Sequence, residues 1–417
     1  MPKKTWKLLF CLSVAAVLLP LAARADELRL LPSIAEKVEY NDNIFITPSN
    51  APASQKFHDF ISTTSGGLQL LSNTERLNLD VSARVDQLFY KDNPSFNSTD
   101  QFYKAALKYS LTQKLSVSLR GEFDRDSRPD RELFTSGLVL SLSALRREVS
   151  MEGLTADYAL TSLTTASLMY DHGQYWFKNN HGVDMTYDTS SLSFIRDVSD
   201  YIKNLKARFT LGYSRYNFTG LEVDNYEATT GLEYALQEKW KFLMDVGARY
   251  TESYFETLKI IAILGPFVFV SPTNVTSTGS AFVGKATLAY TGEKTTGNIV
   301  SGRDVMPAYG SLGTVERTFA TANINRRFTY ELSGFLDGGY FINKTQAGQL
   351  AAFPLNTDTF YGTAGLRYQF NRGRPGDMYL EGSYNFVWIE NKAANPITVA
   401  RRNLFVIRFF VQHAILE

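Results

Sequence analysis

The residues best placed to do chemistry in this chain are charged side chains that recur at alternate positions of short segments. Twelve of them stand out: Arg84, Asp86, Arg120, Glu122, Lys206, Arg208, Asp245, Arg249, Arg367, Glu381, Arg402 and Arg408. Guanidinium, ammonium and carboxylate groups on a hydrated wall can set selectivity along a polar pathway. They can also simply pair with one another across the wall. The two interpretations are compatible, and because both signs are mixed, we expect no strong preference for anions or cations.

Catalytic chemistry has little support in the sequence. The four histidines, at positions 58, 172, 181 and 413, are scattered, and none lies in a motif that joins a nucleophile to its base. His172 follows Asp171, but near a strand end we expect it to be a solvated rim residue. Cys11 is the only cysteine and lies in the N-terminal leader, so the remaining chain has no haem attachment motif. We predict a protein that is not an enzyme and has no metal site and no cofactor.

The elements that must position the charged groups are ten-residue segments of alternating polarity. The clearest examples are Leu77–Val85, Leu115–Phe123, Leu205–Tyr213, Phe242–Tyr250 and Phe405–Val411. A period of two places apolar side chains on one face of a strand and polar ones on the other. Repeated along a secreted chain, the pattern predicts an all-β, antiparallel transmembrane β-barrel with lipid outside and water inside.

The number of such segments is about eighteen, with sixteen as the alternative, both even counts found among bacterial outer-membrane barrels. The first lies near Ser33–Tyr40 and the last spans Asn403–Ile415. Short turns alternate with longer connections, which is typical of periplasmic turns and external loops and places both termini in the periplasm. Parity switches around Gly153 and Ser191 suggest bulges. Residues 298–309 are too irregular to assign.

The N-terminal 25 residues predict a cleaved signal peptide. Lys3, Lys4 and Lys7 precede an apolar stretch that ends before Ala23-Arg24-Ala25, a small-x-small cleavage site. The expected mature domain is residues 26–417. Removing these three lysines and Arg24 leaves 39 of the 43 basic residues against 42 acidic ones, a formal charge of −3. This balance argues against a nucleic-acid partner.

One segment departs from the alternation. Residues 259–270 hold two apolar runs on either side of a Gly-Pro turn, which suggests a hairpin. The hairpin could prolong two strands above the membrane, which we favour because continuous pairing satisfies the backbone. It could instead fold inward as a constriction formed by Ile260, Ile263, Gly265, Pro266, Phe267 and Phe269.

The start of the mature chain, Val38-Glu39-Tyr40-Asn41-Asp42-Asn43-Ile44-Phe45 followed by Thr47-Pro48, resembles a β-barrel porin family associated with exopolysaccharide synthesis and export systems. The turn Leu160–Thr164 is similar to the family's strand-turn pattern. The resemblance implies an outer-membrane conduit for a secreted polysaccharide that works with periplasmic and inner-membrane export components. It transfers no site residue, because Asn41, Asp42 and Asn43 have the side chains of a turn.

The sequence therefore predicts an integral outer-membrane channel, and the resemblance makes polysaccharide export its most specific function. The alternatives are a general diffusion porin, a barrel sheath around a multihaem electron-transfer partner, and an outer-membrane hydrolase. The expected partners are outer-membrane lipid and the barrel-assembly machinery, for which the last strand has a suitable pattern although the chain ends in Glu417 rather than an aromatic residue.

Overall fold

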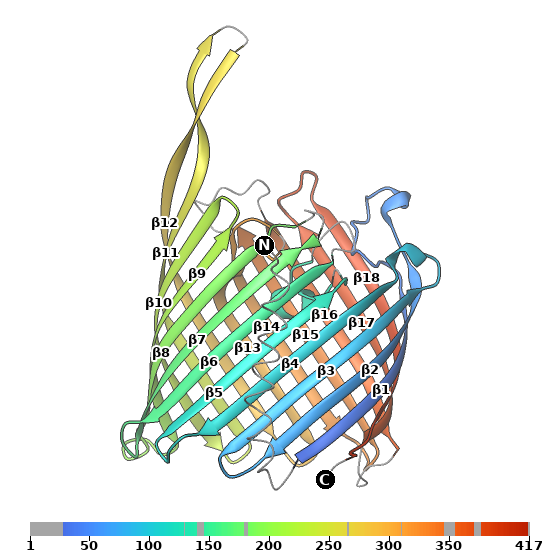
Figure 1. Cartoon of the computed structure of the whole chain (residues 1–417), viewed down its shortest axis with the longest axis vertical. Coiled ribbons are helices and arrows are strands. Elements are labelled where there is room, and N and C mark those ends of the chain that lie inside the picture. Colours follow the sequence, from blue (N-terminus) through green and yellow to red (C-terminus); the bar gives the residue numbers. More distant parts are fainter. Residues whose placement is uncertain are drawn as a thin grey trace, which may run out of the picture.

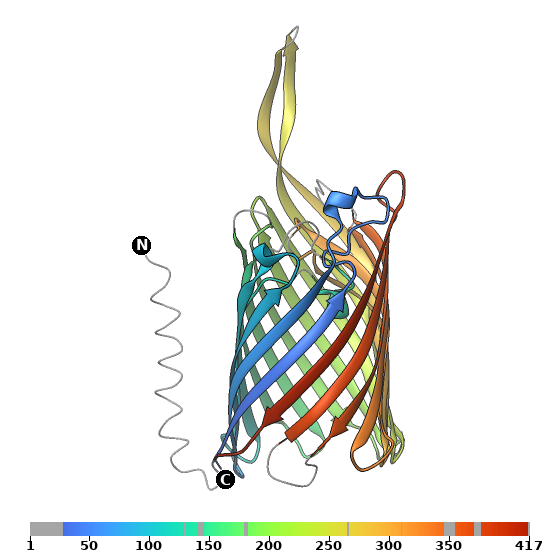
Figure 2. The same ribbon diagram turned by 90° about the vertical axis from the view of Figure 1, so that its right-hand side faces the viewer.

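The computed structural model of the chain is a closed barrel of eighteen antiparallel strands (Figures 1 and 2). It describes residues 28–128, 130–139, 146–178, 182–264, 267–309, 311–345, 355–370 and 377–415, with the backbone alone for 257–264, 267–270 and 272. Each strand pairs with the next along the chain, and β1 pairs with β18 from Ser33↔Gln412 to Asn41↔Leu404. The predicted architecture and strand number are confirmed. The predicted signal peptide lies outside the described residues.

The strands are 12 to 25 residues long and are joined by short connections at one end of the barrel and mostly longer ones at the other. Their bounds are β1 Leu28–Asn41, β2 Asp59–Asn73, β3 Leu77–Tyr90, β4 Ser98–Ser110, β5 Leu115–Asp126, β6 Arg147–Ala159, β7 Thr164–Phe177, β8 Met185–Asp197, β9 Leu205–Phe218, β10 Leu221–Gln237, β11 Trp240–Leu264, β12 Phe267–Thr291, β13 Thr295–Pro307, β14 Thr314–Arg327, β15 Leu332–Thr345, β16 Asn356–Gln369, β17 Asp377–Asn391 and β18 Thr398–Gln412. Among the described residues, three single-turn helices lie in the longer connections: η1 Ala53–Gln55, η2 Pro94–Phe96 and α2 Leu133–Ser136. No helix in the described part of the chain is long and apolar enough to cross a membrane.

The outer wall carries the apolar set of the alternation. Val85, Leu119 and Phe209 are 41%, 49% and 45% exposed although they are large and apolar. Such exposure is unfavourable in water over a whole barrel wall and favourable in lipid. The polar residues between them face the interior. The structure is therefore that of an integral outer-membrane barrel.

Outward-facing tyrosines mark one edge of the apolar wall by a repeated diagonal contact. Each donates its hydroxyl to a polar residue two positions nearer the long-loop end than its direct cross-strand partner. The four pairs are Tyr170 with Asp188 (2.6 Å), Tyr213 with Asp224 (2.7 Å), Tyr340 with Asp358 (2.7 Å) and Tyr384 with Asn403 (2.6 Å). A ring in an apolar layer with its hydroxyl in a polar one is the arrangement of an aromatic girdle at a membrane interface.

The parity switches have a different cause from the one expected. The pairing of β6 and β8 with their neighbours runs through Gly153 and Ser191 without a register shift, so the predicted bulges are wrong. A Cβ on Gly153 would lie 2.4 Å from Arg120 Nε and from Asp171 Oδ1. The absence of a side chain at Gly153 leaves room for this ion pair. The apolar residues of β6 and β8 change face because Val149, Met151, Met185 and Tyr187 pack in one inner cluster, whereas Leu154 and Leu192 of the same strands face outward. The irregular segment 298–309 is mostly strand β13.

The apolar hairpin prolongs two strands. β11 and β12 pair continuously from Trp240↔Tyr290 to Leu264↔Phe267, with one bulge between Ile260 and Ala262. Figures 1 and 2 show this ribbon projecting away from the barrel beyond the long-loop rim. The described strands thus do not fold into the lumen as a constriction, because continued pairing already satisfies their backbone. Gly265 and Pro266 lie outside the described residues.

Candidate functional site: an inward-folded loop that crosses the barrel

The connection between β5 and β6 enters the barrel interior. It contains the four-residue helix α2, which lies within the barrel outline in both perpendicular views (Figures 1 and 2). Ser136 caps the turn by donating its hydroxyl to the Glu132 carbonyl at 2.7 Å. Gly137 ends the helix in a left-handed conformation with φ +71°, which favours glycine. The sequence folds locally into a compact turn with polar groups on either side of it.

The loop is held by the wall opposite its origin. Its strands β5 and β6 lie about half-way around the ring from β14, β15 and β16. The Ser136 carbonyl accepts a hydrogen bond from Asn343 Nδ2 of β15 at 3.0 Å, and the Gly137 carbonyl accepts one from Thr359 Oγ1 of β16 at 2.7 Å. Arg317 of β14 donates to the Thr135 carbonyl. The loop therefore crosses the lumen, and side chains of the far wall hydrogen-bond its backbone carbonyls.

Apolar contacts reinforce this docking. Leu133 is 0% exposed and packs in a cluster with Ile46, Phe341, Tyr361, Val387 and Ala400. The Phe134 ring meets the Tyr361 ring edge-on at 5.0 Å between centroids. Full burial of a leucine side chain contributes roughly 1.5–3 kcal/mol. The wall of β15 to β18 is thus shaped as a seat for the helix.

A charged network holds the segment before the helix. Asp130 binds Arg402 of β18 at 2.5 Å and Arg128 at 3.3 Å, and Arg128 reaches Glu39 of β1 at 3.0 Å. Arg402 is 0% exposed and also donates to Asn385 Oδ1 at 2.9 Å. Breaking a buried ion pair by removing one partner costs about 3–5 kcal/mol. These pairs therefore tie the loop to the closing seam of the barrel between β1 and β18.

A second group of charges anchors the root of the loop. Arg147, the first residue of β6, contacts Glu132 beside the helix and Asp126 at the end of β5, the latter at 3.4 Å. Arg131 also pairs with Asp126. Both ends of the crossing segment are therefore fixed by ion pairs, one at its origin and one on the far wall.

The connection between β13 and β14 also folds inward. The Tyr309 ring packs against the Tyr175 ring of β7, tilted by 40° with 4.9 Å between centroids, and Leu312 packs on the same apolar cluster of β6 to β10. Leu138 of the first loop packs with Ala308 and Val315, which flank this second connection. Two loops from opposite sides of the barrel thus meet inside it and narrow the path through the lumen.

The predicted luminal charges lie mostly in ion pairs along the inner wall, at positions alternate to the exposed apolar residues. The pairs are Arg84 with Asp86 (3.1 Å), Glu122 with Lys104 (2.6 Å), Arg120 with Asp171 (2.5 Å), Arg208 with Asp245 (2.9 Å between Nε and Oδ1), Arg367 with Glu381 (2.6 Å), Lys206 with Glu233 (3.9 Å) and Arg249 with Glu316 (3.3 Å). Arg408 stacks 5.3 Å from the centroid of Phe410. Their part in solute passage stays a prediction.

His172 and Asp171 do not form a catalytic pair. Successive residues of β7 point to opposite faces, and Asp171 binds Arg120 while His172 Nδ1 lies 2.8 Å from Asp188 Oδ1. Asp188 is the residue that accepts the outward Tyr170 hydroxyl, so His172 belongs to the outer rim. No group of three or more histidine, cysteine or acidic residues that could hold a metal is found within the described residues.

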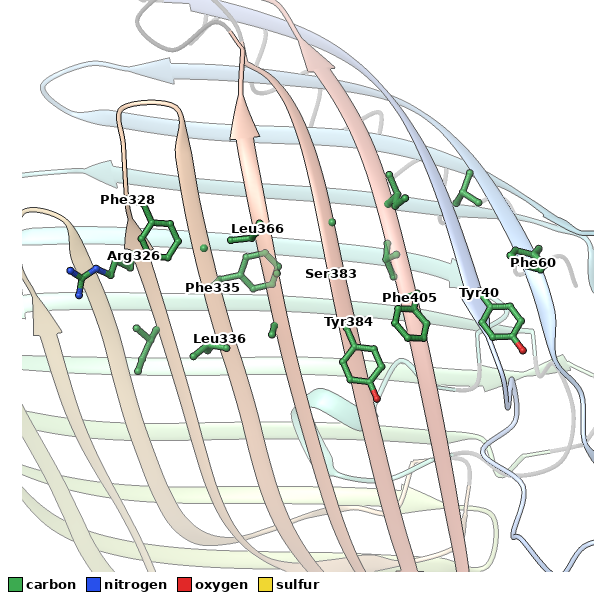
Figure 3. Close-up of a pocket in the computed structure, with 18 residues that line it drawn as sticks. Tyr40, Phe60, Arg326, Phe328, Phe335, Leu336, Leu366, Ser383, Tyr384 and Phe405 are labelled. Atoms are coloured by element: carbon green, nitrogen blue, oxygen red, sulfur yellow. The ribbon is translucent and has the colours of Figure 1, made fainter.

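A groove of about 920 Å³ lies on the outer wall and is separate from the loops. Gly334, Ala364 and Gly382 are among the small residues that line it, between larger neighbours such as Leu366 and Ile407. Figure 3 shows Tyr384, Phe405 and Tyr40 following one another across adjacent strands at this groove. Leu366 and Ile407 are 54% and 62% exposed and face away from the helix seat, so the groove faces lipid.

Comparison with known proteins shows similarity in the barrel architecture only. No protein-family model and no curated protein matches the sequence. The structure is similar to Acinetobacter baumannii OccAB1 (9% identity, 94% of this chain and 98% of that one, TM-score 0.47) and to Pseudomonas aeruginosa OpdO (9%, 94% and 98%, 0.45). It is also similar to P. aeruginosa OccK2 (OpdF), which was solved in complex with glucuronate (7%, 94% and 99%, 0.44).

The loop was not expected from the sequence, in which residues 259–270 were the only candidate for a constriction and were favoured as prolonged strands instead. The available signal was charge density: Asp124 to Glu132 contains seven ionisable residues in nine, far more than an ordinary external loop requires. Such a run is usually solvated, and only its contacts with Glu39 and Arg402 show that it is buried. These partners are 89 and 272 residues away in sequence.

The docked loop should resist acid. Burial alone would raise the pKa of Asp130, but Arg128 and Arg402 outweigh it and hold that pKa well below its ordinary value. The stabilisation is then complete above the ordinary pKa of about 3.9 and is lost only as the pH falls through the lower value in the docked loop. We expect single-channel conductance to stay constant from pH 7 to about 4. A rise in conductance between pH 6 and 5 would contradict the conclusion that the ionised Asp130 carboxylate keeps the loop docked in this range.

Proposed function

We propose that the protein is an outer-membrane channel for small polar solutes whose lumen is restricted by the β5–β6 loop. The observation that carries the proposal is the loop itself, which crosses a charged lumen and is pinned by the buried Asp130 and Arg402 pair at 2.5 Å. A barrel of about eighteen strands can enclose an aqueous channel, and a fixed internal loop sets the size of what passes. Mixed luminal charges fit weak ion selectivity.

The crossing loop favours small solutes over a polymer. Export of an exopolysaccharide, which the sequence resemblance implies, would require the loop to leave its seat on β14 to β18 and to give up its hydrogen bonds to Asn343 and Thr359. Passage of a small solute requires no such movement. We place the barrel in the outer membrane with its short turns and both termini in the periplasm. The long loops and the β11–β12 ribbon then face the cell exterior.

Planar-bilayer recordings combined with vesicle swelling test this function. We expect the purified barrel to conduct salt with weak selectivity between cations and anions, and vesicles to swell in small sugars but not in oligosaccharides. A matched strain lacking the protein should keep its surface polysaccharide. Absence of conductance in a folded barrel would overturn the proposal that the protein is a channel. Loss of surface polysaccharide in the strain that lacks the protein would favour polysaccharide export. Co-purified haem or a hydrolase activity would favour the remaining alternatives.

A further inference from the structure

The β11–β12 ribbon extends far beyond the wall. Pairing of β11 with β10 ends at Phe255, and pairing of β12 with β13 ends at Gly284. Beyond those points the two strands pair only with each other within the described ranges, out to Leu264↔Phe267. Nine residues of β11 past Phe255 correspond to roughly 30 Å of ribbon. Figures 1 and 2 show the ribbon standing clear of the other loops along the barrel axis.

The outer part of the ribbon is apolar on both faces. Its cross-strand pairs are Ile260↔Val270, Ala262↔Phe269, Ile263↔Val268 and Leu264↔Phe267, and no charged residue occurs from Ile260 to Thr273. Successive pairs belong to opposite faces of a ribbon. A strand with one face in water alternates, whereas a continuous apolar run is typical of a strand covered on both faces. The composition therefore predicts that something covers this segment on both sides.

Backbone chemistry decides what that partner is. Each strand of a two-stranded ribbon has one unpaired edge, whose N–H and C=O groups need hydrogen-bond partners. In hydrocarbon each unsatisfied group costs several kcal/mol, so an open ribbon does not enter a bilayer. Proteins protect solvent-facing edges with charges, prolines or bulges. This ribbon has Pro272 and a bulge between Ile260 and Ala262, but beyond them, from Ala262 to Leu264 and from Phe267 to Ser271, the described strands have no charge, proline or further bulge. A partner must supply both backbone groups and apolar side chains, and a β-strand supplies both.

We propose that the partner is a second copy of this chain, joined ribbon to ribbon. The runs Ile260–Leu264 and Phe267–Val270 have high β-propensity, no charge and no proline, which is the signature of segments that pair with themselves. Every copy in one membrane presents the same run at the same height with its strands along the barrel axis. Neighbouring ribbons can therefore pair edge to edge. Such pairing stabilises each hairpin, because an isolated two-stranded hairpin is only marginally stable in water.

Charge substitution at one cross-strand pair tests the proposal. The test variant is Ile263→Lys with Val268→Lys, and the matched control is Thr257→Lys with Thr273→Lys, which places the same charges on a polar pair of the same ribbon. Analytical ultracentrifugation of the full barrels in detergent should show dimers or larger assemblies for the native chain and the control. The test variant should sediment as single barrels. Heat-modifiable gel migration should show that all three barrels are folded.

Cross-linking in intact outer membranes gives an independent readout. Phe269→Cys introduces a thiol on the ribbon, and the native chain has one cysteine, Cys11 in the predicted signal peptide. Mild oxidation should produce a covalent dimer with Phe269→Cys, and much less with Ser199→Cys in a turn at the opposite end of the barrel. Single native barrels at every concentration, assembly that survives the paired lysines, or ribbon-dependent binding to protein-free lipid vesicles would each overturn the proposal.

Discussion

Replacing Arg402 with alanine is expected to raise single-channel conductance by releasing the β5–β6 loop. The guanidinium of Arg402 is fully buried and binds both Asp130 and Asn385, so its removal leaves Asp130 without one of its two cationic partners. The cost of breaking such a pair is about 3–5 kcal/mol. Since 1.4 kcal/mol is about a factor of ten, the equilibrium between docked and released loop shifts by roughly a hundredfold to a few thousandfold.

The matched control is Arg367→Ala. Arg367 is also an inward arginine on the same side of the barrel and pairs with Glu381 at 2.6 Å, but its side chain is 44% exposed. An exposed pair contributes about 0–1 kcal/mol, and this one does not touch the loop. We therefore expect conductance close to that of the native channel. Equal conductance of the native and Arg402→Ala channels, with both barrels folded, would show that this pair does not hold the loop in place.

A second variant separates loop release from loss of luminal charge. Asp130→Asn removes the carboxylate partner and keeps Arg402, so the net luminal charge changes in the opposite sense from Arg402→Ala. If loop release governs the path, both variants should increase conductance. If local charge governs it, the two variants should shift ion selectivity in opposite directions and leave the conductance similar.

The sequence sufficed for the barrel because the wall depends on a local pattern. Leu77 to Val85 and Phe405 to Val411 are assigned to lipid by their own parity, and each strand pairs with its neighbour in the chain. Parity likewise places Tyr170 and Tyr384 on the outer face of their strands. Their diagonal hydrogen bonds to Asp188 and Asn403 follow from the register, which the sequence does not show.

The site escaped prediction because it depends on contacts across the ring. Parity places Arg402 on the inner face, as expected for a residue lining a lumen, but the structure buries it completely under a loop from the other side of the barrel. Arg249 is likewise inward and only 4% exposed. Alternation gives the direction of a side chain and contains no information on what covers it. The apolar run at 259–270 attracted the constriction hypothesis because its two apolar stretches around a Gly-Pro turn depart from the alternation in a connection.

Gly137→Ala should release the loop from its seat, and Gly220→Ala should not. Both glycines have left-handed backbones, with φ of +71° and +81°. An alanine there costs about 1–2 kcal/mol of backbone strain in either place. A Cβ at Gly137 would also lie 2.5 Å from Cβ and Cγ of Phe341, whereas one at Gly220 would meet nothing within 4 Å. Overpacking of that kind adds about 1–3 kcal/mol, so only Gly137→Ala is penalised by the wall against which the loop docks.

The two alanine variants therefore separate the effect of loop docking against Phe341 from the effect of backbone strain. We expect Gly137→Ala to raise single-channel conductance toward that of Arg402→Ala, because the clash with Phe341 and the displaced Gly137 carbonyl, which accepts from Thr359, both favour the released loop. Gly220→Ala, in the turn between β9 and β10, should keep native conductance with a small loss of thermal stability. Equal conductance in the two variants would mean that the close approach of Gly137 to β15 does not control the path.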